Sequence, residues 1–157
     1  MLDLAIATGD EYQALAHSVE ESFGRLDGLV QNAAILGQRL SIEQYDPAEW
    51  QRVLQVNLTA PFVLTQQLLP LLKKSDDASI VFTSSGVGKT GKANWGAYSA
   101  SKFGIESLSQ MVASENEHTA VRSNCINPGP VRTAMRLEAH PTEDRAQLPA
   151  PGDILAD

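Results

Sequence analysis

The chain has 157 residues, 43% of them hydrophobic and 20% charged, which fits one globular domain with a core of its own. Its 19 acidic and 12 basic residues give a formal net charge of −7, and no cluster of Lys or Arg is visible. This balance argues against a nucleic-acid-binding protein but not against an anionic cofactor, because backbone N–H groups can hold phosphates.

Apolar segments of strand character alternate with longer helical patterns, which predicts an α/β fold built on a parallel sheet. The first segment, residues 1–6, is expected to end a strand. A helix capped by Thr8 or Asp10 is then expected to run to Phe23, because apolar residues recur at helical spacing. Residues 26–34 predict a buried strand and the turn that follows it.

The next predicted element is a long helix that contains a proline. Pro47 favours a first helical turn, and the helical pattern continues to residues 73–74. Pro61 lies inside this helix and has no N–H to donate to the carbonyl of Asn57, four residues earlier. A kink or an irregular turn is therefore expected near Asn57.

The rest of the sequence continues the alternation and then becomes polar. Three further elements are expected: strands at residues 79–84 and 121–127, and a helix from residues 95–98 to His118. After Met135 the sequence is polar and contains several prolines. We therefore divide the chain into an α/β domain, residues 1–135, and a loosely ordered tail or loop, residues 136–157.

Tyr98 and Lys102 stand four residues apart in the last predicted helix. Residues at this spacing lie on one helix face, so the phenol and the ammonium group can point into the same space. A nearby cation lowers the pKa of a tyrosine, which can then exchange a proton with an alcohol or carbonyl oxygen. The same spacing also occurs on ordinary amphipathic helices, so this pair does not identify an enzyme by itself.

Ser85 comes thirteen residues before Tyr98, after a predicted strand and before a glycine-rich loop. Side chains at the carboxyl ends of parallel strands meet ligands in open α/β sheets. A serine hydroxyl at this place can bind a substrate oxygen. The alternative is that Ser84 and Ser85 merely cap the loop.

The segment from Ser84 to Lys102, SSGVGKTGKANWGAYSASK, resembles the active-site segment of the short-chain dehydrogenase/reductases. Four further segments resemble motifs of that family, in the family's order: Asp3-Leu4, QNAA at residues 31–34, Asn57 in VNLTAPF, and NPGPVRT at residues 127–133. The resemblance implies a Rossmann-like, doubly wound parallel sheet. It also implies an NAD(P)-dependent oxidoreductase that interconverts a secondary alcohol and a carbonyl.

By the same resemblance, Tyr98 is the general acid/base, and Lys102 binds the nicotinamide ribose and lowers the pKa of Tyr98. Ser85 orients the substrate carbonyl, and Asn57 holds a water in a proton relay with Lys102. The implied cofactor-binding residues are those that match the family's motifs: Asp3, Leu4, Asn32, Ala33, Ala34, Tyr98, Lys102, Pro128, Gly129, Val131 and Thr133. No metal site is implied.

The chain departs from the family pattern in one motif and in what precedes Asp3. Gln31 and Ala34 replace Asn and Gly of the family's NNAG motif. No glycine-rich TGxxxGxG segment, which would hold the pyrophosphate of the cofactor, precedes Asp3. We therefore expect a sequence truncated at both ends, with about 60 residues missing at its start at roughly 30 residues per βαβ unit. Such a chain is expected to bind either cofactor weakly and to end in a truncated substrate loop.

Two hypotheses of function remain open. The first is the oxidoreductase described above, which uses NAD or NADP and acts on a small alcohol or carbonyl compound. The second is a catalytically inactive fragment that serves only in subunit assembly, because the helices carrying Asn57 and Tyr98 pack between subunits in the family. A homo-oligomer, dimer or tetramer, is expected by resemblance. The single cysteine, Cys125, the lack of a signal peptide and the lack of an apolar run of about 18 residues favour a cytoplasmic protein without a membrane partner.

Overall fold

A computed structural model describes residues 2–154 of the chain. Its centre is a three-stranded parallel sheet whose strands lie in the order β1-β2-β3: Gly28–Gln31, Ala78–Thr83 and Val121–Ile126. Leu29 pairs with Ile80, and Phe82 pairs with Cys125. The predicted parallel α/β sheet, with the strands of Leu29, Val81 and Cys125 as neighbours, is confirmed.

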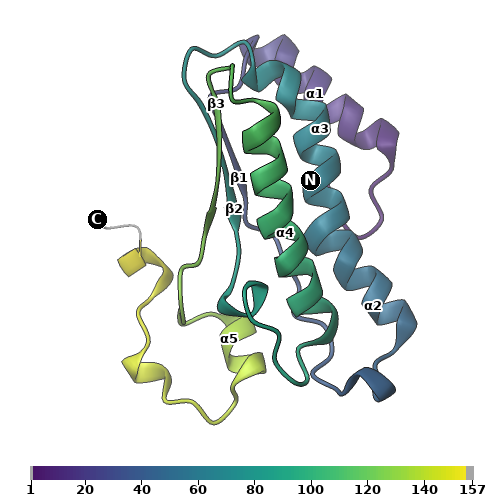
Figure 1. The fold of residues 1–157 in the computed structure, drawn as a ribbon, viewed down its shortest axis with the longest axis vertical. Helices are drawn as coiled ribbons and strands as arrows, with labels where there is room; N and C mark the ends of the chain where they lie inside the picture. Colours follow the sequence, from purple (N-terminus) through teal and green to yellow (C-terminus); the bar gives the residue numbers. More distant parts are fainter. Residues whose placement is uncertain (1, 155–157) are drawn as a thin grey trace.

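The long helices lie together on one side of this sheet (Figure 1). They are α1, α2, α3 and α4: Gly9–Phe23, Pro47–Leu54, Ala60–Leu72 and Gly96–Glu115. On the opposite face Val30 is 69% exposed and Ile126 is 47% exposed. The arrangement is Rossmann-like, and the second helical layer of a doubly wound sheet is not found within residues 2–154.

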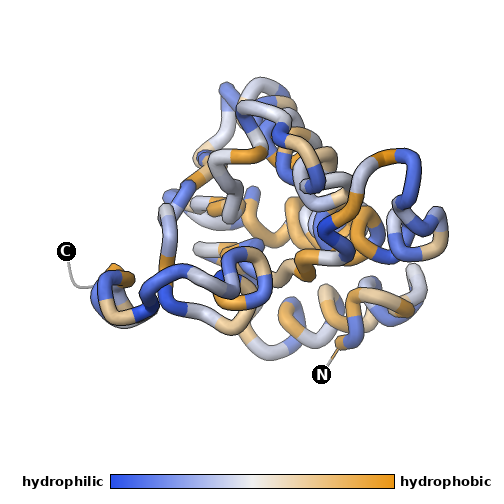
Figure 2. The backbone as a smooth tube through the Cα atoms, turned by 90° about the horizontal axis from the view of Figure 1, so that it is seen from below, coloured by the Kyte–Doolittle hydropathy of each residue, from blue (hydrophilic) through white to orange (hydrophobic). Residues whose placement is uncertain are grey.

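The core lies between the sheet and the helices because the strands alternate in burial. In β2 every second residue, including Ile80 and Phe82, points to the helices and is fully buried. Ile105, Leu108 and Val112 recur along one face of α4 and pack against these strand residues. Figure 2 shows hydrophobic stretches gathered between the helices and the strands, with hydrophilic ones in the outer loops.

The start of the described chain differs from the prediction. Residues 4–6 form a turn, and no strand is found at residues 2–6, because Asp3 accepts hydrogen bonds from the residues that follow it. The Asp3 carboxylate accepts from the N–H of Ala5, and its carbonyl accepts from the N–H groups of Ile6 and Ala7. Thr8, rather than Asp10, caps α1, in a reciprocal capping box.

The long helix is interrupted where its proline predicts. A π-helical turn, Gln55–Thr59, separates α2 from α3, and the N–H of Ala60 donates to the carbonyl of Gln55. The Pro61 ring follows this turn, so the predicted irregularity near Asn57 is confirmed. Asn57 is thereby placed at a single turn of altered pitch, a feature that often occurs at functional sites.

The end of the described chain is more ordered than predicted. A short helix, α5 (Ala134–Ala139), begins after Thr133, whose side chain accepts from the N–H of Arg136. It lies near the carboxyl ends of the strands (Figure 1). The boundary that we placed after residue 135 falls inside this helix, and the two-part division stays a prediction. No helix within residues 2–154 is both long and apolar enough to cross a membrane.

Candidate active site

A cavity of about 410 Å³ opens at the carboxyl edge of the sheet. Its floor comes from the segments that follow the strands: Asn32 after β1, Ser84 and Ser85 after β2, and Asn127 after β3. Parallel strands end at the same edge, so residues distant in sequence meet there. The predicted residues that line the cavity are Ser85, Tyr98, Lys102, Asn32, Ala33, Ala34, Pro128, Gly129, Val131 and Thr133.

Lys102 is a buried cation at this cavity. It lies one turn after Tyr98 on α4 and is only 3% exposed. Its Nζ donates to the carbonyl of Thr83, 2.7 Å away, and lies 5.6 Å from the centroid of the Tyr98 ring. Burial lowers the pKa of Lys102 to about 8, because the charged form loses its water.

The pKa of Tyr98 is shifted in the opposite direction from the one expected from the sequence. Burial raises the pKa of its phenol, and a hydrogen bond with the Ser85 side chain opposes this effect. Lys102 lies near the ring but does not lower the pKa of Tyr98, contrary to the expectation from the sequence. The phenol is therefore protonated at neutral pH, in the state that a proton donor needs.

The two serines after β2 have different surroundings. Ser85 precedes a 3₁₀ turn, Gly86–Gly88, yet its side chain makes no capping hydrogen bond there. Its hydroxyl instead reaches Tyr98 and lines the cavity, which is not the arrangement of a simple loop cap. Ser84 is buried, and within residues 2–154 its hydroxyl finds no partner.

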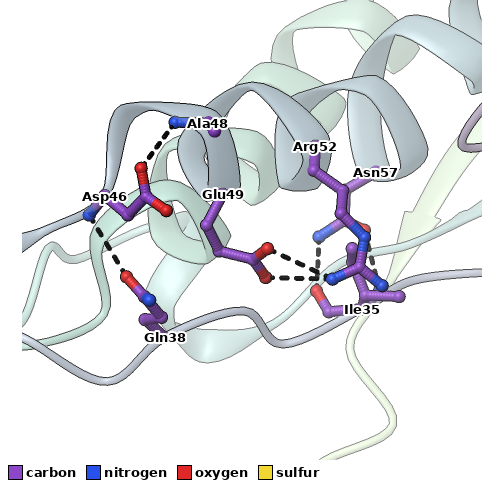
Figure 3. A network of polar contacts seen from close by, with 7 residues as sticks. All are labelled: Ile35, Gln38, Asp46, Ala48, Glu49, Arg52 and Asn57. Atoms are coloured by element: carbon purple, nitrogen blue, oxygen red, sulfur yellow. Dashed lines mark hydrogen bonds and ion pairs between the residues drawn. The ribbon is translucent and has the colours of Figure 1, made fainter.

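Asn57 does not line the cavity but is joined to it. Its Oδ1 accepts from the N–H of Ile35 at 2.8 Å, and its Nδ2 donates to the Ile35 carbonyl at 2.9 Å (Figure 3). Nδ2 also donates to the hydroxyl of Ser101, which donates in turn to the carbonyl of Tyr98. The 1% exposed amide of Asn57 thus ties the segment after β1 to the helix that carries Tyr98.

The remaining predicted residues, Asp3 and Leu4, also lie outside the cavity. Asp3 forms the turn before α1, and the carbonyl of Leu4 accepts from the Gln55 side chain at 3.4 Å. Gln31, a departure from the family motif, is buried and directs its Nε2 to the carbonyl of Pro61 at 3.2 Å. The longer side chain of Gln31 therefore serves the contact between β1 and α3.

The sequence did not reveal the apolar wall of the cavity. Leu36, Val87 and Tyr98 form a buried cluster, against which Trp95, Met135 and Ala139 pack. Trp95 precedes Tyr98 by three residues, at the start of α4, and this helical spacing could have indicated it. Met135 and Ala139 could not be found in this way, because their helix was expected to be a tail.

A sequence model of the family described as short chain dehydrogenase matches residues 1–144. The chain is 51% identical over 155 residues to Uncharacterized oxidoreductase YciK of Escherichia coli strain K12, covering 99% of this chain and 61% of that protein.

Two similar solved structures hold a cofactor. One is a short chain dehydrogenase from Shigella flexneri 2a complexed with NADP, at 50% identity and a TM-score of 0.95, covering 99% of this chain and 64% of that chain. The other comes from Escherichia coli CFT073 and is complexed with NADPH, at 52% identity and a TM-score of 0.95, covering 98% and 64%. The chain thus spans less than two thirds of the length of these relatives.

Proposed function

Because the chain belongs to the short-chain dehydrogenase family, we propose that it carries the catalytic part of an NADP-dependent oxidoreductase. The reaction is the interconversion of a secondary alcohol and a carbonyl compound. The observation that carries this proposal is the meeting of Ser85, Tyr98 and Lys102 in one cavity at the carboxyl edge of the sheet.

The cavity suits the nicotinamide half of such a cofactor. Ala33 and Gly129 are small and leave room beside the strand ends, and Asn32 and Lys102 supply polar groups. Pro128, Val131, Thr133 and Ala34 complete this side of the proposed site, and Asp3 and Leu4 are assigned to its adenine end. The cofactor supplies or accepts the hydride when it is bound. We choose NADP over NAD because two relatives with about half of their residues identical hold it.

In the direction of reduction, Tyr98 gives its proton to the carbonyl oxygen of the substrate. Its raised pKa keeps this proton in place at neutral pH. Ser85 donates a hydrogen bond to the same oxygen and stabilises the charge that develops on it. Lys102 binds the ribose, and the main-chain carbonyl of Asn57, to which Pro61 cannot donate, holds the water that links Lys102 to solvent.

Replacing Tyr98 by Phe tests the proposal. In a full-length version, Tyr98→Phe removes the transferable proton and little else, so NADPH-dependent reduction of a ketone panel is expected to fall by about 10²–10⁴-fold. NADPH affinity, followed by its fluorescence, is expected to stay unchanged. Tyr12→Phe is the matched control, because it removes a buried hydroxyl on α1, outside the cavity. More than a tenth of the original activity in Tyr98→Phe would assign the proton transfer to another group.

We also propose that copies of the chain associate through α3 and α4 and that the protein is cytoplasmic. Phe62 on α3 and Phe103 and Met111 on α4 are between 44% and 50% exposed. Exposed apolar side chains of this size favour a protein contact. The location is supported by the single cysteine, Cys125, which suits a reducing compartment.

A further inference from the structure

A second hollow adjoins the cavity on the side of Trp95. It has a volume of about 360 Å³ and shares Ser85, Trp95, Asn127, Gly129 and Arg136 with the first cavity. Its other walls include Lys92, from the loop before α4, and His140, from the end of α5. A molecule whose reacting oxygen meets Ser85 and Tyr98 can therefore extend toward Lys92 and His140.

Positive charge gathers around this second hollow. Lys92, Arg136 and His140 line it, and the Arg39 guanidinium lies 4.0 Å from the centroid of the Trp95 ring. The pKa of His140 is lowered, first by burial and then by Arg136, Arg39 and Lys92, with Glu143 acting in the other direction. Lys92 and Arg136 therefore supply the positive charge of this hollow, whereas the lowered pKa favours the neutral form of His140 and Arg39 contacts Trp95 without lining the hollow.

The lining of the two hollows is free of acidic side chains among the described residues. Of the described residues that line them, none is Asp or Glu, although the chain carries a net charge of −7. Glu143 pairs with Arg136, but Arg39 donates only to the carbonyls of Asn94 and Ala139. Within residues 2–154, Lys92 is exposed and its ammonium group makes no hydrogen bond or ion pair. Lys92 thus brings to the second hollow a positive charge that no acid of the described residues neutralises.

Apolar side chains line the space from the reacting groups to this charge. Leu36 and Met135 line the first cavity, Val87 lines the second hollow and Trp95 lines both, and the four belong to one apolar cluster. Building on the proposed oxidoreductase function, we propose that the substrate is a ketone or alcohol with an aryl or other apolar body and a terminal anionic group. The anionic group lies in the second hollow, beside Lys92 and Arg136.

The test compares two ligands that differ only in charge. The probes are para-acetylbenzoate and para-acetylbenzamide, titrated while the indole N–H signals of the two tryptophans are followed by NMR. The Trp95 signal is expected to move, whereas Trp50, which packs on Tyr45 outside both hollows, serves as an internal reference. The benzoate is expected to bind roughly tenfold more tightly than the amide at low salt, with the difference shrinking as salt is added.

Two variants test whether the charge of Lys92 contributes to benzoate binding. Lys92→Gln is expected to weaken benzoate binding by about twofold to fivefold, since exposed charges act weakly. Lys73→Gln at the end of α3 removes the same charge elsewhere and should leave binding unchanged. Equal affinity for the two probes, equal effects of the two variants, or movement of the Trp50 signal alone would overturn the inference. In a full-length version supplied with NADPH, binding of the benzoate without its reduction would instead contradict the proposed function, and equal reduction of both probes would contradict only the anionic substrate.

Discussion

Lys102 is a cation that the fold buries without giving it a carboxylate partner. Its ammonium group meets the carbonyl of Thr83, and burial brings its pKa from an ordinary 10.5 to about 8. Between these two pH values the unfolded chain binds more protons than the folded one, so stability rises with pH. Below pH 8 the cost of the buried charge is present in full. A residue that costs stability and lies at a cavity is a functional candidate.

The first prediction at the residue scale concerns Lys102→Met. The apolar side chain removes the cost of burying the charge, which is about 3 kcal/mol at pH 7 and about 1 kcal/mol at pH 10. The free energy of unfolding of the variant, relative to the original protein, should therefore decrease by about 2 kcal/mol between these pH values. Urea unfolding of both proteins at each pH measures this change. A difference that is independent of pH would mean that Lys102 keeps its ordinary pKa in the fold.

At the scale of elements, the π-helical turn between α2 and α3 brings Asn57 to the segment after β1. The Asn57 amide satisfies both the N–H and the carbonyl of Ile35, which stand near the end of a short strand (Figure 3). The start of α2 holds the other end of the segment between β1 and α2. The Asp46 carboxylate accepts from the N–H of Ala48, and the N–H of Asp46 donates to the Gln38 side chain. The turn therefore fixes the position of the segment after β1, which lines one side of the cavity.

Asn57→Ala is expected to destabilise the fold by about 2–6 kcal/mol, because it leaves two backbone groups of Ile35 without partners at about 1–3 kcal/mol each. Thermal or urea unfolding measures the loss. Asn124→Ala serves as the control, because this exposed residue of β3 makes no hydrogen bond with its side chain within residues 2–154. If both variants lose the same stability, the Ile35 contacts do not hold the loop.

At the scale of the whole molecule, apolar side chains face outward from the helical layer. Phe62 and Phe103 are 47% and 44% exposed, on adjacent long helices (Figure 1). A surface that covers them would remove apolar area from water, which favours association. The exposed apolar surface is formed by α3 and α4 together, and neither helix provides it alone.

Phe103→Ser is expected to weaken self-association by about tenfold or more, as for an aromatic residue at the centre of an interface. Light scattering after size-exclusion chromatography, over a range of protein concentrations, measures the change in mass. Phe23→Ser on α1 is the matched control, since Phe23 is exposed at another site. An unchanged dissociation constant in Phe103→Ser would place any interface elsewhere.

The sequence by itself determined the three strands of the sheet, the long helices, the break at Pro61 and the place of Ser85 after a strand, and the resemblance to a family indicated the other cavity residues that follow strand ends. These features depend on local signals: alternation of apolar residues, a missing N–H, and the rule that parallel strands end at one edge. Only the tertiary structure decided that the buried Tyr98 has a raised pKa and that α5 contributes Met135 to the site. It alone brought Arg39 to Trp95. Burial and long-range contacts depend on how distant segments pack, and no local pattern encodes them.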